Sequence, residues 1–274
     1  MEIANFLELV SVGLIAGTWG SLIGAGGGFL IVPILLFLNR DLSAAGATAV
    51  SLIAVFANGL SGALTYAKLR LIDYGLGILF VVATLPGAVI GALLVNYIDK
   101  GSFQVIFGIL IGAVGIYLSI RSGQPKPTNK KIAGKSRELR DAQGQVYRYS
   151  ANRPLGTALT FLIGFLASML GVGGGIFSVP AFVILLGIPI QVATATSQFM
   201  LVGTSLVASI TNVLEGDLQG WWAAAIALSI GSLAGGQIGP RIAQKFGSVW
   251  LTRALSTGLL VVAARLAWNG LSAR

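Results

Sequence analysis

Two apolar stretches, residues 6–38 and 155–186, are each too long to cross a membrane as one straight helix. As a helix, each would extend about 50 Å, whereas the hydrocarbon core of a bilayer is about 30 Å thick. Both are interrupted near the middle by glycines. Only 10% of the 274 residues are charged and 55% are hydrophobic, whereas about a quarter of the residues of a soluble domain are charged. The sequence therefore predicts an all-α polytopic membrane protein and excludes an ordinary water-soluble domain.

Three plainer apolar segments of membrane-spanning length follow each long stretch. They lie near 43–67, 74–97 and 102–120 in the first half, and near 190–214, 220–243 and 249–269 in the second. Residues 121–153 hold nine Lys or Arg and two Asp or Glu, which is +7 of the net charge of +9. The composition of this segment does not predict a domain of its own. We therefore predict a first transmembrane repeat at 1–120, a basic cytoplasmic linker at 121–153 and a second transmembrane repeat at 154–274.

The two halves are copies of one another. The sequence Gly24-Ala-Gly-Gly-Gly28 with a following Val-Pro33 recurs as Gly171-Val-Gly-Gly-Gly175 with a following Val-Pro180, at an offset of 147. A second motif, Ala-Thr-x-x-Ser51, recurs as Ala-Thr-x-x-Ser197 at an offset of 146. Repetition of both motifs in the same order indicates an internal duplication.

The distribution of charge predicts how the copies are related. If each long stretch crossed the membrane once, the outer loops would carry a net charge of +3, against the positive-inside rule. If each is instead a hairpin of two half-helices that returns to its own side, the inner loops other than the linker carry +4 and the outer side carries −2. We therefore predict two inverted repeats, each a broken-helix (re-entrant) hairpin plus three transmembrane helices, with both termini outside.

The glycine breaks indicate a function. Broken helices at membrane depth are tolerated only where protein or water satisfies the freed backbone groups. Inverted repeats with matching broken helices are typical of secondary transporters, whose substrate site lies between the repeats. The second half-helices are expected to start near Phe29 and Ile176, and a helix start suits an anion because it offers unpaired N–H groups and about half a positive charge. The alternative is that the glycines are packing faces between helices.

Polar side chains that follow the breaks complete the predicted site. Ser51 and Ser197 belong to the second repeated motif, Gln198 follows directly, and Asn58 lies on the same helix face as Ser51. The alternative role for such residues is hydrogen bonding between helices. The predicted substrate-binding residues are Gly24, Gly26, Gly27, Gly28, Ser51, Asn58, Gly171, Gly173, Gly174, Gly175, Ser197 and Gln198.

The sequence lacks the residue types that other functions need. It contains no Cys and no His, and no Asp, Glu, Lys or Arg lies near the middle of a predicted span. We therefore predict no metal site, no cofactor and no enzymatic activity. Because the basic charge is concentrated in 121–153, a nucleic-acid partner is not predicted, and this linker is expected to lie against anionic membrane lipid.

The duplicated Gly-x-Gly-Gly-Gly motif with Val-Pro, followed by Ala-Thr-x-x-Ser, resembles the sulfite exporter TauE/SafE family of membrane permeases. The resemblance covers both halves and leaves out mainly the linker. It implies a transporter of bacterial inner membranes with a small anionic substrate, such as sulfite or a sulfonate. The matching positions are Gly24, Gly26, Gly27, Gly28 and Pro33, and Gly171, Gly173, Gly174, Gly175 and Pro180.

Together these features predict a secondary transporter that exports small, sulfur-containing anions by alternating access. An inside-negative potential favours anion exit by about 2.3 kcal/mol per charge per 100 mV, so export needs no coupling ion. A passive anion channel is the alternative, and the sequence makes no prediction of the oligomeric state.

Overall fold

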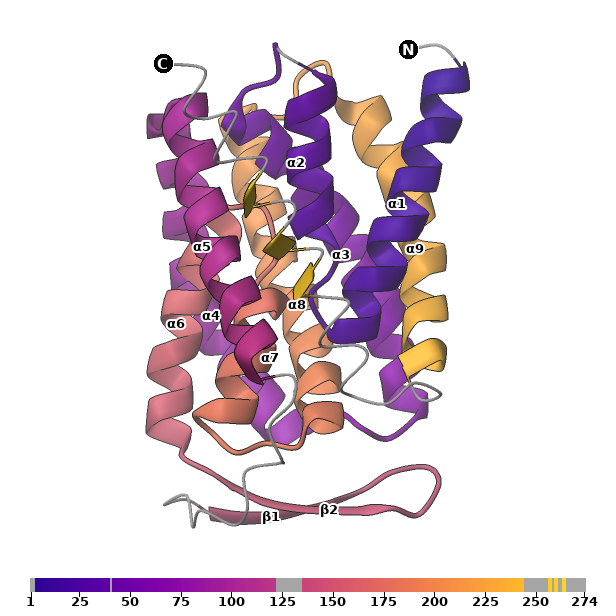
Figure 1. The fold of residues 1–274 in the computed structure, drawn as a ribbon, viewed down its shortest axis with the longest axis vertical. Helices are drawn as coiled ribbons and strands as arrows, with labels where there is room; N and C mark the ends of the chain where they lie inside the picture. The colour runs from indigo at the N-terminus through magenta and orange to yellow at the C-terminus, as the bar shows by residue number, and fades with distance from the viewer. Residues whose placement is uncertain are drawn as a thin grey trace.

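The computed structural model describes residues 3–39, 41–121 and 135–243, and short helical pieces at 256–257, 259–260 and 263–264 (Figure 1). The first long apolar stretch forms α1 (Ile3–Ile23) and α2 (Gly28–Leu38), and the second forms α6 (Arg153–Met169) and α7 (Gly175–Ile184). Both stretches therefore break at the predicted glycines, and α2 and α7 each begin one residue before the expected position.

Five of the six plainer segments are helical as predicted. They form α3 (Ala44–Lys68), α4 (Tyr74–Leu94) with the 3-10 helix η1 (Val95–Tyr97), α5 (Lys100–Arg121), α8 (Ile190–Glu215) and α9 (Trp222–Ala243). The predicted segment 249–269 lies mostly outside the described residues. Side chains of Ser43, Asp73 and Asn152 cap α3, α4 and α6 by accepting a hydrogen bond from a backbone N–H three residues on, which fixes where these helices start.

Six of the described helices are long and apolar enough to cross a membrane: α1, α3, α4 together with η1, α5, α8 and α9. Large apolar side chains face outward along them, including Ile78, Val82, Ile109 and Leu206, which are 57%, 61%, 64% and 40% exposed. An exposed apolar surface of this extent suits lipid rather than water. The molecule is therefore a mostly helical, multi-pass membrane protein.

Helices from the two halves pack closely through glycines. On α1, Gly13 and Gly17 lie against Leu228 and Ser232 of α9, and the two helices run in the same direction. On α4, Gly87 and Gly91 lie against α6 in the same way. Small residues spaced by four allow such close backbone approach in membranes. The central helices α3 and α8 instead run antiparallel, with Gly59 beside Leu201 and Gly62 beside Gln198.

The basic linker contains a two-stranded β-hairpin beside the otherwise helical fold. Strand β1 (Lys135–Arg140) pairs antiparallel with β2 (Val146–Ala151), with Arg137 opposite Tyr149. The hairpin lies across the end of the helix bundle opposite the start of α1 (Figure 1). Its turn is held by Asp141, whose carboxylate accepts hydrogen bonds from two backbone N–H groups. Local sequence patterns do not predict these strands, because charged side chains interrupt the apolar pattern of both.

Candidate functional site

The two glycine breaks, residues 24–28 and 171–175, lie against each other. A Cβ added to Gly28 would overlap the carbonyl oxygen of Gly171, and one added to Gly175 would overlap the carbonyl oxygen of Gly24. The two contacts are equivalent, because Gly28 and Gly175 occupy the same position in the two repeats, as do Gly24 and Gly171. All ten residues of the breaks are buried. The start of each of α2 and α7 therefore lies at backbone-to-backbone distance from the first residues of the opposite break.

The backbone of both breaks requires glycine for a second reason. Three residues in each have a positive φ, a conformation that other L-residues rarely adopt. The angles are 76°, 77° and 85° at Gly24, Gly26 and Gly27, and 70°, 76° and 100° at Gly171, Gly173 and Gly174. The repeated glycine pattern is thus explained by backbone shape and by the contact between the breaks.

Unpaired backbone N–H groups point to a ligand at this contact. Leu30 and Ile31 donate to the carbonyl of Gly27, and Phe177 and Ser178 donate to that of Gly174. Within the described part of the chain, the N–H groups before them, at 28–29 and 175–176, have no backbone acceptor. Buried N–H groups are nearly always paired in proteins, and a helix start favours negative charge. The geometry therefore suits an anion or a water molecule.

The two predicted serines join each break to the other half. The Ser51 hydroxyl donates to the carbonyl of Gly171 at 2.7 Å, and the Ser197 hydroxyl donates to that of Gly24 at 3.0 Å. Both serines are buried. The structure thus brings Ser51, Ser197 and the eight glycines together, and the serine hydroxyls donate to carbonyl oxygens in this conformation.

Asn58 and Gln198 form a separate network among α1, α3, α8 and α9. The Asn58 amide donates to the carbonyls of Gly17 and Ser232 at 2.8 and 3.1 Å. Because both partners can only accept, the Asn58 side-chain oxygen must face Gln198, which donates to it at 2.9 Å. This network lies two helical turns along α1 from the first break. In this structure Asn58 and Gln198 therefore form hydrogen bonds between helices, which is the alternative role considered for them.

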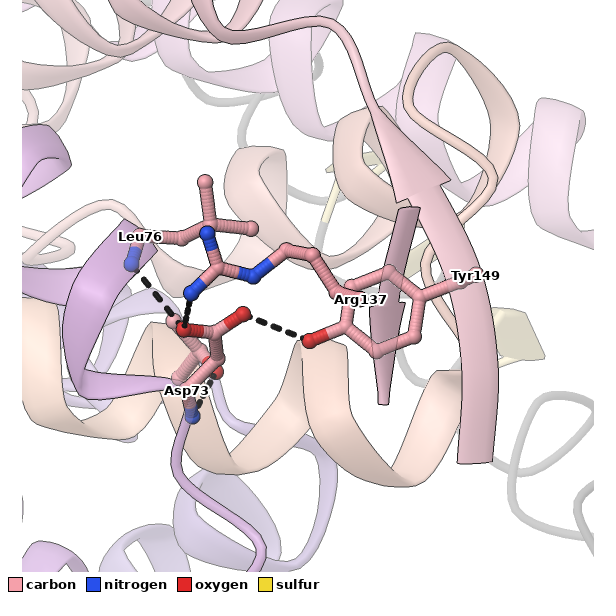
Figure 2. Close-up of polar contacts among 5 residues, drawn as sticks. Asp73, Leu76, Arg137 and Tyr149 are labelled. Carbon is pink, nitrogen blue, oxygen red and sulfur yellow. Dashed lines mark hydrogen bonds and ion pairs between the residues drawn. The ribbon is translucent and has the colours of Figure 1, made fainter. Parts of the chain in front are cut away.

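The hairpin makes a buried ionic contact that the sequence analysis missed. Arg137 pairs with the Asp73 carboxylate at 2.6 Å, and the Tyr149 hydroxyl donates to its other oxygen at 2.6 Å (Figure 2). Asp73 is only 5% exposed. Burial, and next the hydrogen bond to Asp73, raise the pKa of Tyr149 above its usual range. The alternation of Tyr147 and Tyr149 before Ala151 was the available signal for this strand.

This contact reaches the first break through the backbone. The Asp73 N–H donates to the Thr196 hydroxyl at 3.1 Å, and Thr196 directly precedes Ser197. The linker is therefore attached to the same end of α8 that holds the carbonyl of Gly24. Among the described residues, no group of three or more acidic side chains could hold a metal ion.

Comparison with known proteins identifies the fold's relatives. The family model for the sulfite exporter TauE/SafE matches residues 9–266. The probable membrane transporter protein YunE of Bacillus subtilis is 35% identical, with 97% of this chain and 99% of the relative covered. The probable membrane transporter protein MJ0441 of Methanocaldococcus jannaschii is 29% identical, with 93% of this chain and 92% of the relative covered. The probable membrane transporter protein YfcA of Escherichia coli is 24% identical, with 98% of this chain and 95% of the relative covered.

No solved structure gives a significant match to the chain. The family match extends through both glycine breaks and nearly the whole chain, and its curated relatives are named as membrane transporters. With six candidate spans and two buried breaks in contact, the chain is a membrane transporter that belongs to the sulfite exporter TauE/SafE family.

Proposed function

We propose that the protein exports small, sulfur-containing anions such as sulfite or sulfonates, and that the substrate binds where α2 and α7 begin. The observation that carries this proposal is the contact between the two breaks, at which buried N–H groups from both half-helices lack backbone acceptors among the described residues. The name of the family supplies the class of substrate.

Within this site the glycine N–H groups would contact the anion. Carbonyl oxygens repel an anion, and the Ser51 and Ser197 hydroxyls occupy one lone pair of the Gly171 and Gly24 carbonyls. The Asn58–Gln198 pair would fix the position of α1 relative to α3 and α8. Since no fixed cation is involved, the binding is expected to be weak and fast, which suits a transporter.

We further propose alternating access between two inverted halves. The antiparallel course of α3 and α8, which are equivalent helices of the two copies, supports an inverted relation. The course of α2, which runs back toward the end of the bundle where α1 starts (Figure 1), supports a re-entrant hairpin. Such broken helices place a substrate near the midplane of the membrane.

The orientation follows from charge. The hairpin end carries the basic linker, so it is proposed to lie in the cytoplasm, with the two termini outside the inner membrane. Anion exit is then favoured by the membrane potential, and the anionic inner leaflet would attract the linker.

Solute counterflow in proteoliposomes tests the proposal. Purified full-length protein, loaded inside with unlabelled sulfite, should accumulate labelled sulfite transiently, and sulfonates should compete. Saturable counterflow supports a carrier. Flux that rises linearly with concentration and shows no counterflow would indicate the passive channel instead, and no flux of any anion would overturn the substrate class.

A further inference from the structure

Four buried polar side chains near the second break have atoms without hydrogen-bond partners. These residues, here called the second-break cluster, are Thr48, Ser168, Ser209 and Asn212. In the part of the chain that the structure describes, no partner is found for their three hydroxyl oxygens or for either side-chain atom of Asn212. Their exposed fractions are 0%, 0%, 8% and 0%. Buried polar groups are rarely left unpaired, and an unpaired group in a native structure points to a functional partner.

Packing contacts place these residues together. The Cα of Thr48 lies against Gly171, and Gly171 donates its N–H to the carbonyl of Ser168. Along the antiparallel crossing of α3 and α8, Gly62 lies beside Gln198 and Gly59 beside Leu201. The same register sets Thr48 opposite Asn212.

Two further contacts bracket this position. Leu52 and Ala208 share one core cluster on one side of it, and Gly46 lies near the carbonyl of Asp217 on the other. Ser209 is three residues before Asn212, on the same face of α8. Thr48, Ser209 and Asn212 therefore lie on facing turns of α3 and α8 beside Gly171, and Ser168 lies three residues before Gly171, at the end of α6.

At the equivalent place near the first break, two of the polar side chains are hydrogen-bonded. In the other repeat, Thr194, Ser21, Ala63 and Tyr66 occupy the positions of Thr48, Ser168, Ser209 and Asn212, respectively. The Tyr66 hydroxyl donates to the carbonyl of Ser21 at 3.0 Å, and the Ser21 hydroxyl donates to the carbonyl of Gly235 at 3.0 Å. The long phenol of Tyr66 thus reaches a partner near the first break, whereas the shorter amide of Asn212 reaches none of the described residues near the second.

We infer that the second-break cluster is the polar subsite for the oxygen atoms of the transported anion. This inference rests on the proposed function and adds to it the residues that contact the substrate. Three hydroxyls and one amide can donate hydrogen bonds, and the unpaired N–H groups at the start of α7 lie on the same break. That donor set fits the oxygens of a sulfite or sulfonate group. Tyr66 closes the matching place in the other half.

Equilibrium binding of labelled sulfite to the purified full-length protein tests the subsite. Thr48→Val, Ser168→Ala and Asn212→Leu each remove a donor with little change of volume. We expect each to raise the Kd for sulfite about tenfold. The matched control, Tyr66→Phe, removes one hydroxyl at the first break and should change the Kd less than twofold.

Thermal unfolding without substrate gives a second, independent measurement. Because the replaced atoms are unpaired, Thr48→Val and Asn212→Leu should leave Tm unchanged or raise it, while Tyr66→Phe should lower it. Variants with lowered Tm and wild-type Kd would show that the cluster is structural and would overturn the inference. If the wild type itself neither binds nor transports sulfite or sulfonates, the proposed function fails and not the location of the subsite alone.

Discussion

The two glycine breaks share a backbone but differ in the side chains around them. Each has three positive φ angles and accepts one serine hydroxyl from the opposite half. Around the first break, however, Tyr66 is bonded and the β-hairpin is anchored nearby at Asp73. Around the second, Asn212 occupies the position of Tyr66 and has no partner among the described residues.

This difference shows what duplication preserves. Both repeats keep the glycine that touches the opposite break, because a side chain at either position would overlap a backbone carbonyl. The side chains around this contact differ between the repeats. At an offset of 146, Gln198 corresponds to Leu52 and Asn58 to Thr204. A symmetric centre with unlike surroundings allows two similar conformations of unequal free energy, which a transporter with a preferred direction can use.

The largest effect is expected from adding a methyl group where the breaks touch. Gly28→Ala and Gly175→Ala should each lower the free energy of unfolding by about 3 kcal/mol and abolish counterflow, because the Cβ would overlap a backbone carbonyl. Gly101→Ala is the control, since only one side-chain oxygen lies near it. Thermal unfolding in detergent measures the change. Unequal effects at the two glycines would show that the centre is not symmetric.

A smaller effect is expected in the network that only one half has. Asn58→Leu removes two hydrogen bonds to backbone carbonyls and the one from Gln198, whose amide keeps only the backbone carbonyl of residue 58 as acceptor, so a loss of about 2 kcal/mol is expected. Thr204→Val, at the equivalent position, loses only the bonds to Thr84 and to the carbonyl of Met200 and should cost about 0.6 kcal/mol. Equal losses, measured by thermal unfolding, would contradict the asymmetry.

The serine bonds should matter equally on both sides. Ser51→Ala and Ser197→Ala each remove one hydrogen bond to a break carbonyl and should each cost about 0.6 kcal/mol. Counterflow rates should fall by similar factors, since each bare carbonyl then repels the anion. A double-mutant cycle sharpens the comparison, and a large difference between the two single variants would argue against matched roles.

The smallest effect on transport is expected at the hairpin. Arg137→Gln removes the ion pair with Asp73 and should speed cleavage by chymotrypsin at Tyr147 about tenfold, with less than a twofold change in counterflow. Arg148→Gln breaks the exposed pair with Glu138 and should leave cleavage unchanged. Unchanged cleavage in Arg137→Gln would mean that the ion pair does not anchor the hairpin.

The same contact predicts a pH dependence. Since the folded state raises the pKa of Tyr149, the protonated phenol favours the docked hairpin. Its contribution is present below about pH 10, the usual tyrosine pKa, and is lost as the pH rises through the raised value. Chymotrypsin cleavage at Tyr147 should therefore stay slow and constant between about pH 7 and 9. Faster cleavage within that range would contradict the assignment.

Much of this protein could be predicted from local patterns in its sequence. The apolar runs predicted nine described helices, and Gly24 and Gly171 marked where the two long apolar stretches break. These features are local, because helix length and positive φ depend on neighbouring residues. The hairpin was not predicted, since its strands are charged and are stabilised by Asp73, which lies more than sixty residues away.

The sequence by itself determined that the chain is a duplicated membrane protein with two glycine-broken helices. Only the tertiary structure decided that Ser51 bonds the break 120 residues away and that Ser197 bonds the one 173 residues away. It also decided that the Tyr66 hydroxyl has a partner, whereas the Asn212 amide has none among the residues that the structure describes. Such pairings depend on how whole helices cross, and a hydrogen bond forms only when that crossing brings donor and acceptor within about 3 Å.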